Sequence, residues 1–238
     1  MSWLLNSSIG RKLIMSVSGF FLVFFLIFHA TMNMVAVFSE DAYNTICGLL
    51  GANWYAVAGT AVLGGFVAIH FIYALLLTLQ NRKARGNANY AVSVRPSGVE
   101  WASQNMFVLG IIIVGFMLLH FSQFWYKMMF TELMGHHEVA LGTSTVSPKD
   151  GAEFVKFYFS HLWVVVAYLI WYVALWFHLS HGIWSAFQTI GTSGKIWLSR
   201  WKVIGNIFAT VVMLAFAFVT IYFYARSVID PSTVAMYY

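Results

Sequence analysis

The stretch "WFHLSHGIWSAF", residues 176–187, places two histidines, His178 and His181, among residues that are mostly apolar or aromatic. It ends an apolar run that begins near residue 158 and is long enough to cross a bilayer, whose hydrocarbon core takes about 20 helical residues. An imidazole in hydrocarbon costs free energy unless another group binds it. The fold and the function of the chain therefore depend on what binds these imidazoles.

The composition of the whole chain also indicates a membrane protein. Of its 238 residues, 61% are hydrophobic and only 9% are charged, whereas soluble domains carry about 25% charged residues. The 13 Lys and Arg against 8 Asp and Glu fit orientation in a membrane and contact with anionic lipid, so we predict no nucleic-acid partner. The single cysteine, Cys47, excludes an intrachain disulfide, a C-x-x-C-H haem attachment and an iron–sulfur cluster held by this chain alone.

Five apolar stretches are long enough to span the membrane. We predict an all-α integral membrane bundle of five transmembrane helices in a single domain, residues 1–238. The helices are expected near 13–37, 54–79, 102–126, 158–187 and 203–225. The N-terminus and the segments 80–101 and 188–202 hold nine Lys and Arg, against four in the other connections. Because basic residues stay on the cytoplasmic side, we predict a cytoplasmic N-terminus.

Five of the eight histidines lie inside the predicted spans: His29, His70, His120, His178 and His181. A helix rises about 1.5 Å per residue, which places His29 and His120 roughly 25 and 28 Å from the cytoplasmic ends of their helices, in the outer half. The same estimate places His70 and His178 roughly 24 and 30 Å from the outer ends of theirs, in the inner half. A single buried histidine is also typical of a structural hydrogen bond or a proton relay, but the set forms two pairs.

Paired imidazoles from facing helices are how a helical bundle holds a b-type haem with two histidine ligands. Two such centres, roughly 15 Å apart by the same rise, would form a path for electrons across the membrane. Each ring's second nitrogen then needs a hydrogen-bond partner that orients it. Small residues before His29 and His70 would allow a macrocycle to approach closely, and ordinary helix packing explains them equally well. They are Ser16, Ser18, Gly19, Gly59, Gly64 and Gly65.

The chain resembles the single-chain, five-helix, dihaem cytochrome b subunits of succinate dehydrogenases and fumarate reductases over essentially its whole length. The stretches that carry the resemblance are "GRKLIMSVSGFFLVFFLIFHATMNM" (10–34), the midspan His70, "GIIIVGFMLLHF" (110–121) and "FHLSHGIWSAF" (177–187). The serine–glycine approach to the first histidine and the H-x-x-x-G pattern followed by an aromatic residue are the specific features. The remainder of the likeness is hydropathy.

The resemblance implies two haem b groups as cofactors. His29 and His120 would be the iron ligands of the outer haem, and His70 and His178 those of the inner one, because the family's fourth ligand stands four residues before a glycine, here Gly182. His181 would then be a neighbour of the site rather than a ligand, and Ser16 a haem contact.

The resemblance also implies a flavoprotein subunit and an iron–sulfur subunit bound on the cytoplasmic side of a bacterial inner membrane. The dicarboxylate chemistry would take place in those partners and not in this chain. Basic residues in the second cytoplasmic segment, namely Arg82, Lys83, Arg85 and Arg95, suit docking of such a partner. Solvated charges next to the membrane would look the same.

The quinone in this kind of anchor is menaquinone, handled near the outer haem, and its chemistry needs a proton donor or acceptor. Glu40, Asp41 and His161 are the candidates on the outer side. One departure concerns transmembrane proton transfer, for which some family members carry an acid two residues before the fourth ligand. This chain has Trp176 there, so we expect electron transfer between the haems to be electrogenic.

Two other functions remain open at this stage. A dihaem anchor of another respiratory complex, such as a hydrogenase or formate dehydrogenase, would share the histidine pairs but should lack the serine–glycine and H-x-x-x-G patterns. A haem-free transporter using histidines as proton relays would need polar or broken helices, which the spans do not show.

Overall fold

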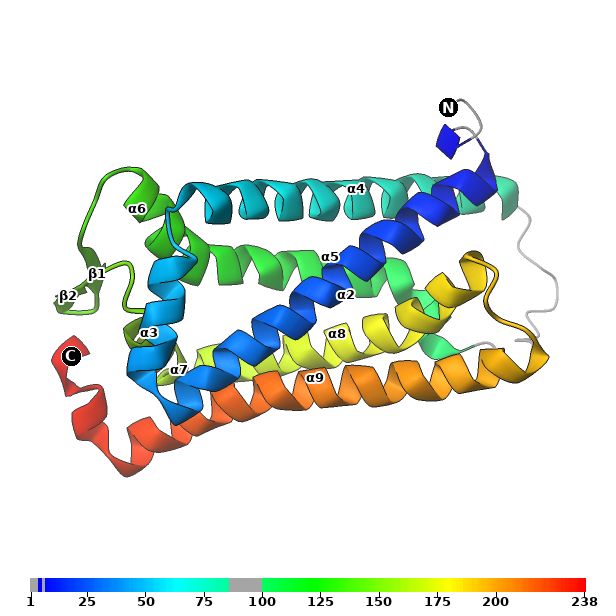
Figure 1. The fold of residues 1–238 in the computed structure, drawn as a ribbon. Coiled ribbons are helices and arrows are strands. Elements are labelled where there is room, and N and C mark those ends of the chain that lie inside the picture. Colours follow the sequence, from blue (N-terminus) through cyan, green and yellow to red (C-terminus); the bar gives the residue numbers. More distant parts are fainter. Residues whose placement is uncertain (1–3, 6, 86–99) are drawn as a thin grey trace. The chain divides into compact units, whose positions relative to one another are not determined.

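The computed structural model describes the chain except residues 1–3, 6 and 86–99. The described part is almost entirely helical, and five of its helical segments are long and apolar enough to cross a membrane (Figure 1). This confirms the predicted all-α membrane fold with five spans. The long helices are α2 (Ser8–Phe38), α4 (Trp54–Arg85), α5 (Trp101–His120), α8 (Leu162–Thr189) and α9 (Lys195–Ile229).

The long helices extend beyond the predicted spans. The first begins at Ser8 instead of near residue 13, and the fifth begins at Lys195 instead of near 203. Hydropathy detects only the part of a helix that lies in hydrocarbon, whereas the hydrogen-bonded backbone can continue into the headgroup region. The third segment runs on to Leu133, because a π-helix, η1 (Phe121–Phe130), and a short α6 (Thr131–Leu133) directly follow His120.

The fourth predicted span, 158–187, is wrong at its start. A separate helix, α7 (Gly151–Phe159), ends there and α8 begins only at Leu162. The carbonyl of Phe157 accepts from the side-chain hydroxyl of Ser160 at 2.8 Å and lies 2.8 Å from Nδ1 of His161. The backbone N–H of His161 donates instead to the carbonyl of Tyr158. Side chains thus take the acceptor that a continuous helix would use, which interrupts it.

The predicted connections 38–53 and 127–157 contain regular structure. The first holds α3 (Glu40–Leu49), with the Ser39 hydroxyl accepting from the Ala42 amide at its N-terminus. The second holds an antiparallel hairpin of β1 (Val139–Leu141) and β2 (Ser144–Val146), with Val139 opposite Val146, and then α7. Two short 3₁₀ turns, η2 (Pro231–Thr233) and η3 (Ala235–Tyr237), follow α9.

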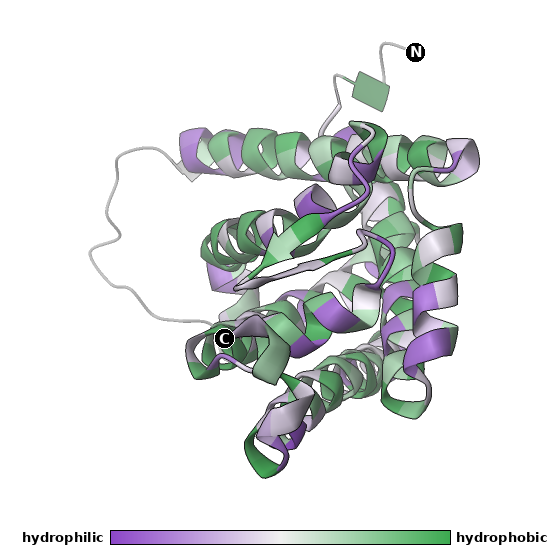
Figure 2. Ribbon diagram, turned by 90° about the vertical axis from the view of Figure 1, so that its left-hand side faces the viewer, coloured by the Kyte–Doolittle hydropathy of each residue, from purple (hydrophilic) through white to green (hydrophobic). Residues whose placement is uncertain are grey.

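The surface of the long helices is suited to lipid. Figure 2 shows hydrophobic residues distributed around them, and the most apolar 18-residue window of α4 contains no buried residue. Large side chains on this surface, such as Ile69, Phe71 and Ile72, are 40–52% exposed. A helix that is hydrophobic all round is typical of a membrane span. The chain is therefore a multi-pass membrane protein.

The chain divides into two compact units, and each of the five long helices contributes a segment to both. Unit 1 comprises Met1–Phe24, Leu63–Ile112 and Ala174–Thr210, and unit 2 comprises Phe25–Val62, Ile113–Val173 and Val211–Tyr238. His70 and His178 belong to unit 1, and His29 and His120 belong to unit 2. Each histidine pair can thus be described within its own unit.

Candidate functional site: two histidine pairs

In unit 1, the imidazoles of His70 on α4 and His178 on α8 lie next to each other. Their ring centres are 6.2 Å apart and the ring planes make an angle of 67°. Nδ1 of His70 lies 3.1 Å from the hydroxyl of Ser18 on α2. Nδ1 of His178 is buried and has no hydrogen-bond partner among the described residues.

The contact between Ser18 and His70 determines which nitrogen of the imidazole carries the proton. The Ser18 hydroxyl donates its only hydrogen to the carbonyl of Met15, 3.0 Å away, so it can meet His70 only as an acceptor. Nδ1 of His70 must then carry the hydrogen, and Nε2 keeps a free lone pair. That is the form of histidine that binds a metal ion through Nε2.

Gly19 allows this contact to form. A side chain added there would place its Cβ 3.3 Å from Cε1 of His70, tighter than an ordinary contact. By contrast, a Cβ at Gly59, Gly64 or Gly65 would meet nothing within 4 Å. Of the small residues noted in the sequence, Ser18 and Gly19 therefore contact the histidine. Ser16 is buried, and its hydroxyl donates to the carbonyl of Lys12 within its own helix.

In unit 2, His29 on α2 and His120 at the end of α5 form the second pair. Their ring centres are 5.8 Å apart with an angle of 84° between the planes. Nδ1 of His120 lies 3.3 Å from the hydroxyl of Tyr168, which itself donates to Oε1 of Gln123 at 2.8 Å. The Tyr168 oxygen is thus an acceptor for His120, which again leaves Nε2 free.

The amide of Asn33 lies beside the His29 ring but selects neither ring nitrogen. Nδ2 of Asn33 is 3.4 Å from Nδ1 and 3.5 Å from Nε2 of His29, and it donates to the His29 carbonyl at 2.8 Å. The hydroxyl of Tyr43, on α3, in turn donates to Oδ1 of Asn33 at 3.1 Å. Sequence reasoning did not single out Asn33, Gln123 or Tyr168, since the rotation of a helix that is apolar all round cannot be read from its hydropathy.

Both pairs fit a metal ion held between two imidazoles. A metal–imidazole bond is about 2 Å long and the ring centre lies about 1.1 Å behind the nitrogen, so two rings on opposite sides of one ion have centres about 6 Å apart. The observed separations of 6.2 and 5.8 Å are close to this value. The residues present therefore fit a haem with two axial histidines.

His181 belongs to a different cluster, also in unit 1. Its Nδ1 lies 3.5 Å from Oε2 of Glu100, which also accepts from the indole of Trp184 at 3.2 Å. The other carboxylate oxygen of Glu100 pairs with Lys202 at 2.8 Å. Partial burial raises the pKa of Glu100, but Lys202, with help from His181 and Trp184, lowers it more, and the net shift is downward. His181 is 9% exposed and faces a carboxylate, an arrangement that suits a packing contact of α8 better than an iron ligand.

The three candidates for quinone chemistry lie in unit 2, and they differ in how well their surroundings suit proton exchange. Glu40 is ion-paired with Lys156 at 3.1 Å and with Arg226. Partial burial raises the pKa of Glu40, but the hydrogen bonds and charges of Lys156 and Arg226 hold it below its ordinary value. A carboxylate fixed in its ionised form by two cations is poorly suited to accept a proton.

Asp41 and His161 are free of such ion pairs among the described residues. Asp41 is exposed in the first turn of α3. His161 lies in the break between α7 and α8 rather than one turn inside the fourth span, and its Nε2 is 3.3 Å from the hydroxyl of Tyr238. A histidine with one nitrogen on a backbone carbonyl and the other on a phenol can pass a proton, so it suits the predicted role better than Glu40.

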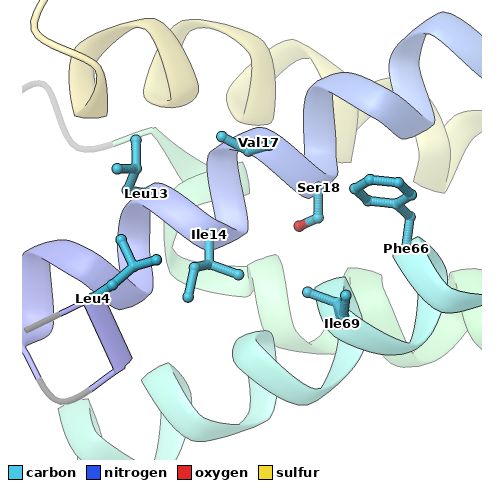
Figure 3. A pocket seen from close by; sticks show the side chains of 7 residues that line it. All are labelled: Leu4, Leu13, Ile14, Val17, Ser18, Phe66 and Ile69. Atoms are coloured by element: carbon cyan, nitrogen blue, oxygen red, sulfur yellow. The ribbon is translucent and has the colours of Figure 1, made fainter. Parts of the chain in front are cut away.

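An apolar pocket of about 230 Å³ lies between α2 and α4 in unit 1 (Figure 3). Ser18, whose oxygen meets His70, is the only polar residue in its lining. The other lining residues are Leu4, Leu13, Ile14, Val17, Phe66 and Ile69. Ser18 thus lies between this apolar space and His70.

On the basic segment expected to meet a soluble partner, Arg82 and Lys83 are exposed. The guanidinium of Arg82 lies 5.6 Å from the ring centre of Phe107. Arg95 and the side chain of Arg85 lie outside the described residues.

The part of the chain that the structure describes contains no group of three or more His, Cys, Asp or Glu residues that could hold a metal ion. A haem draws only its two axial ligands from the protein, so paired histidines are the relevant feature. Comparisons with models of protein families, with curated proteins and with solved structures found no match.

Proposed function

We propose that the chain is the dihaem cytochrome b anchor of a succinate:quinone oxidoreductase, of the succinate dehydrogenase and fumarate reductase kind. It would pass electrons between an iron–sulfur subunit and menaquinone in a bacterial inner membrane. The single observation that carries the proposal is the presence of two imidazole pairs. In each pair the rings come from two long helices, and their separation suits one metal ion between them. The resemblance of residues 10–34 and 177–187 to that family supports it.

The axial ligands would be His70 and His178 in unit 1 and His29 and His120 in unit 2. The chemistry that haem supplies when bound is the exchange of single electrons. The residues of this chain would fix the geometry for that exchange. The oxygens of Ser18 and Tyr168 hold the protonated nitrogens of His70 and His120, which sets the tautomer and orientation of each ring.

Proton exchange with the quinone would occur in unit 2, where His161 and Asp41 are the candidates. The break between α7 and α8 exposes His161 to a hydroxyl of Tyr238, whereas Glu40 remains in its ion pairs. The flavoprotein and iron–sulfur partners would bind where Arg82 and Lys83 are exposed. Succinate and fumarate would react in those partners alone.

Protohaem per chain, measured as the pyridine haemochromogen against quantitative amino-acid analysis, tests the proposal. We expect two haems in the wild type and the loss of one in each of the variants His29→Ala, His70→Ala, His120→Ala and His178→Ala. His136→Ala, which changes an exposed histidine, and His181→Ala should each retain two. Co-purified subunits should reduce a menaquinone analogue with succinate.

A folded preparation without haem, with helicity checked by circular dichroism, would contradict the proposal and favour the haem-free transporter. Two haems without succinate-oxidising partners would assign the chain to another dihaem complex. Loss of a haem in His181→Ala but not in His178→Ala would identify His181, and not His178, as the axial ligand on α8.

A further inference from the structure

Trp171, on α8 in unit 2, has an indole N–H that is buried without an acceptor. Among the described residues only two buried side-chain nitrogen or oxygen atoms have no hydrogen-bond partner, Nε1 of Trp171 and Nδ1 of His178. A buried donor without a partner costs about 1–3 kcal/mol, and a membrane span has no bulk water to satisfy it. Nδ1 of His178 belongs to a residue already assigned to the unit 1 pair, whereas Trp171 belongs to neither histidine pair.

The position of Trp171 ties it to the other histidine pair. Its ring centre is 5.7 Å from that of His120 and 5.6 Å from that of Tyr168. The indole therefore lies beside the site where His29 and His120 meet.

None of the neighbouring side chains accepts from this N–H, and their oxygens bond elsewhere. The Tyr168 hydroxyl bonds Gln123 and faces His120. The Tyr172 hydroxyl pairs with Thr220 at 2.9 Å. The remaining aromatic neighbour, Phe116, whose ring centre is 6.4 Å away, offers no acceptor atom.

We propose that Trp171 donates its indole N–H to an oxygen of the organic group bound at the His29/His120 pair. The inference rests on the proposed function, since it takes that pair to be a ligand site. An indole is an uncharged donor with no acceptor capacity, so the ligand must bring an acceptor oxygen. Such an oxygen has two possible sources, a carboxylate of haem or a carbonyl of a quinone beside it.

The test is ultraviolet resonance Raman spectroscopy of the indole bands that respond to N–H hydrogen bonding, made on the full chain in its native complex. The wild-type spectrum minus that of Trp171→Phe isolates the signal of Trp171, because phenylalanine keeps an aromatic ring but lacks the donor. Trp163→Phe is the matched control, since Trp163 is on the same helix and is 60% exposed. Haem is counted in every sample.

We expect a hydrogen-bonded indole in the wild type. Its change to a free indole on haem depletion identifies the haem carboxylate, and the same change on quinone extraction with both haems retained identifies the quinone carbonyl. Trp171→Phe should weaken retention of the identified group roughly 10- to 100-fold, whereas Trp163→Phe should leave it unchanged.

A free indole in a sample that contains two haems and quinone would overturn the inference while the proposed function stands. A hydrogen-bonded indole that survives removal of both groups would overturn it as well. If the folded wild type contains no haem, the proposed function fails, and the inference then fails too unless quinone extraction alone frees the indole.

Discussion

The hydroxyl oxygen of Ser18 lies 3.1 Å from Nδ1 of His70, and its own hydrogen is engaged by the carbonyl of Met15. Ser18, a buried residue of α2, thus fixes the protonation of a histidine on α4, 52 residues away. In unit 2 the hydroxyl of Tyr168 stands in the same relation to His120, with Gln123 as its acceptor. In both pairs, a hydroxyl whose own hydrogen is bonded elsewhere accepts from Nδ1 of one histidine.

Replacing Ser18 by alanine should weaken retention of the group at His70 and His178 by roughly 10- to 100-fold, as is usual for partners that orient a metal-binding histidine. The group at His29 and His120 should be unaffected. Redox titration followed in the visible spectrum resolves the two centres. Ser227→Ala is the matched control, because Ser227 is also buried and its hydroxyl bonds only the Tyr224 carbonyl of its own helix, and an equal effect of both variants would contradict the assignment.

The variant Tyr168→Phe should change the midpoint potential and spectrum of the other centre only, because it removes the oxygen that holds His120. Tyr172→Phe also deletes a buried hydroxyl, the one that pairs with Thr220, and so controls for a general loss of packing. If both variants shift the same centre equally, Tyr168 has no special role. Electron paramagnetic resonance of the oxidised protein separates the two low-spin signals.

Glu40 should stabilise the fold through its ion pairs with Lys156 and Arg226. Because its pKa is lower in the folded chain than the ordinary value of 4.5, its contribution is complete above that ordinary value and is lost as the pH falls through the lower folded pKa. Glu40→Gln should cost about 1–3 kcal/mol at neutral pH, between the values for exposed and buried pairs.

The difference in melting temperature between wild type and Glu40→Gln, measured in detergent from pH 7 down to pH 3, should shrink as the solution becomes more acidic. Asp41→Asn is the control, since Asp41 is exposed and should show little effect. A difference that stays constant with pH would mean that the charge of Glu40 does not stabilise the fold.

Electron transfer between the two centres should be electrogenic. Trp176, two residues before His178, donates its indole N–H to the Thr210 hydroxyl at 2.9 Å. The eight acidic residues, Glu40, Asp41, Glu100, Glu132, Glu138, Asp150, Glu153 and Asp230, all lie outside the middle of the long helices. Succinate–menaquinone turnover in sealed vesicles should therefore change with an imposed membrane potential, and insensitivity would count against this expectation.

Elements outside the hydrocarbon were the hardest to predict. The connections 38–53 and 127–157 contain α3, a β-hairpin and α7, held by contacts between distant residues. Oε2 of Glu132, for example, accepts from the backbone amide of Ala52 at 3.0 Å, and Lys149 pairs with its other oxygen at 3.1 Å. Such contacts join residues that are far apart in the sequence, so a local sequence pattern does not predict them.

The candidate site was only partly open to prediction. A histidine in an apolar span is rare enough to be recognised from the sequence alone, and this singled out the five intramembrane histidines. Its partners are ordinary residues, a serine for His70 and a tyrosine for His120, and many other serines and tyrosines in the chain look the same in sequence. Glu40 was selected for its acidity, but the structure gives it two cations and a lowered pKa.

The sequence by itself determined the five spans, because the cost of exposing polar groups to hydrocarbon is a property of each run of about 20 residues. Only the tertiary structure decided which faces of the helices meet. A helix that is apolar all round is equally stable in lipid at any rotation about its axis. That rotation is set by packing and by a few hydrogen bonds between helices, such as those of Ser18 with His70 and Tyr168 with Gln123.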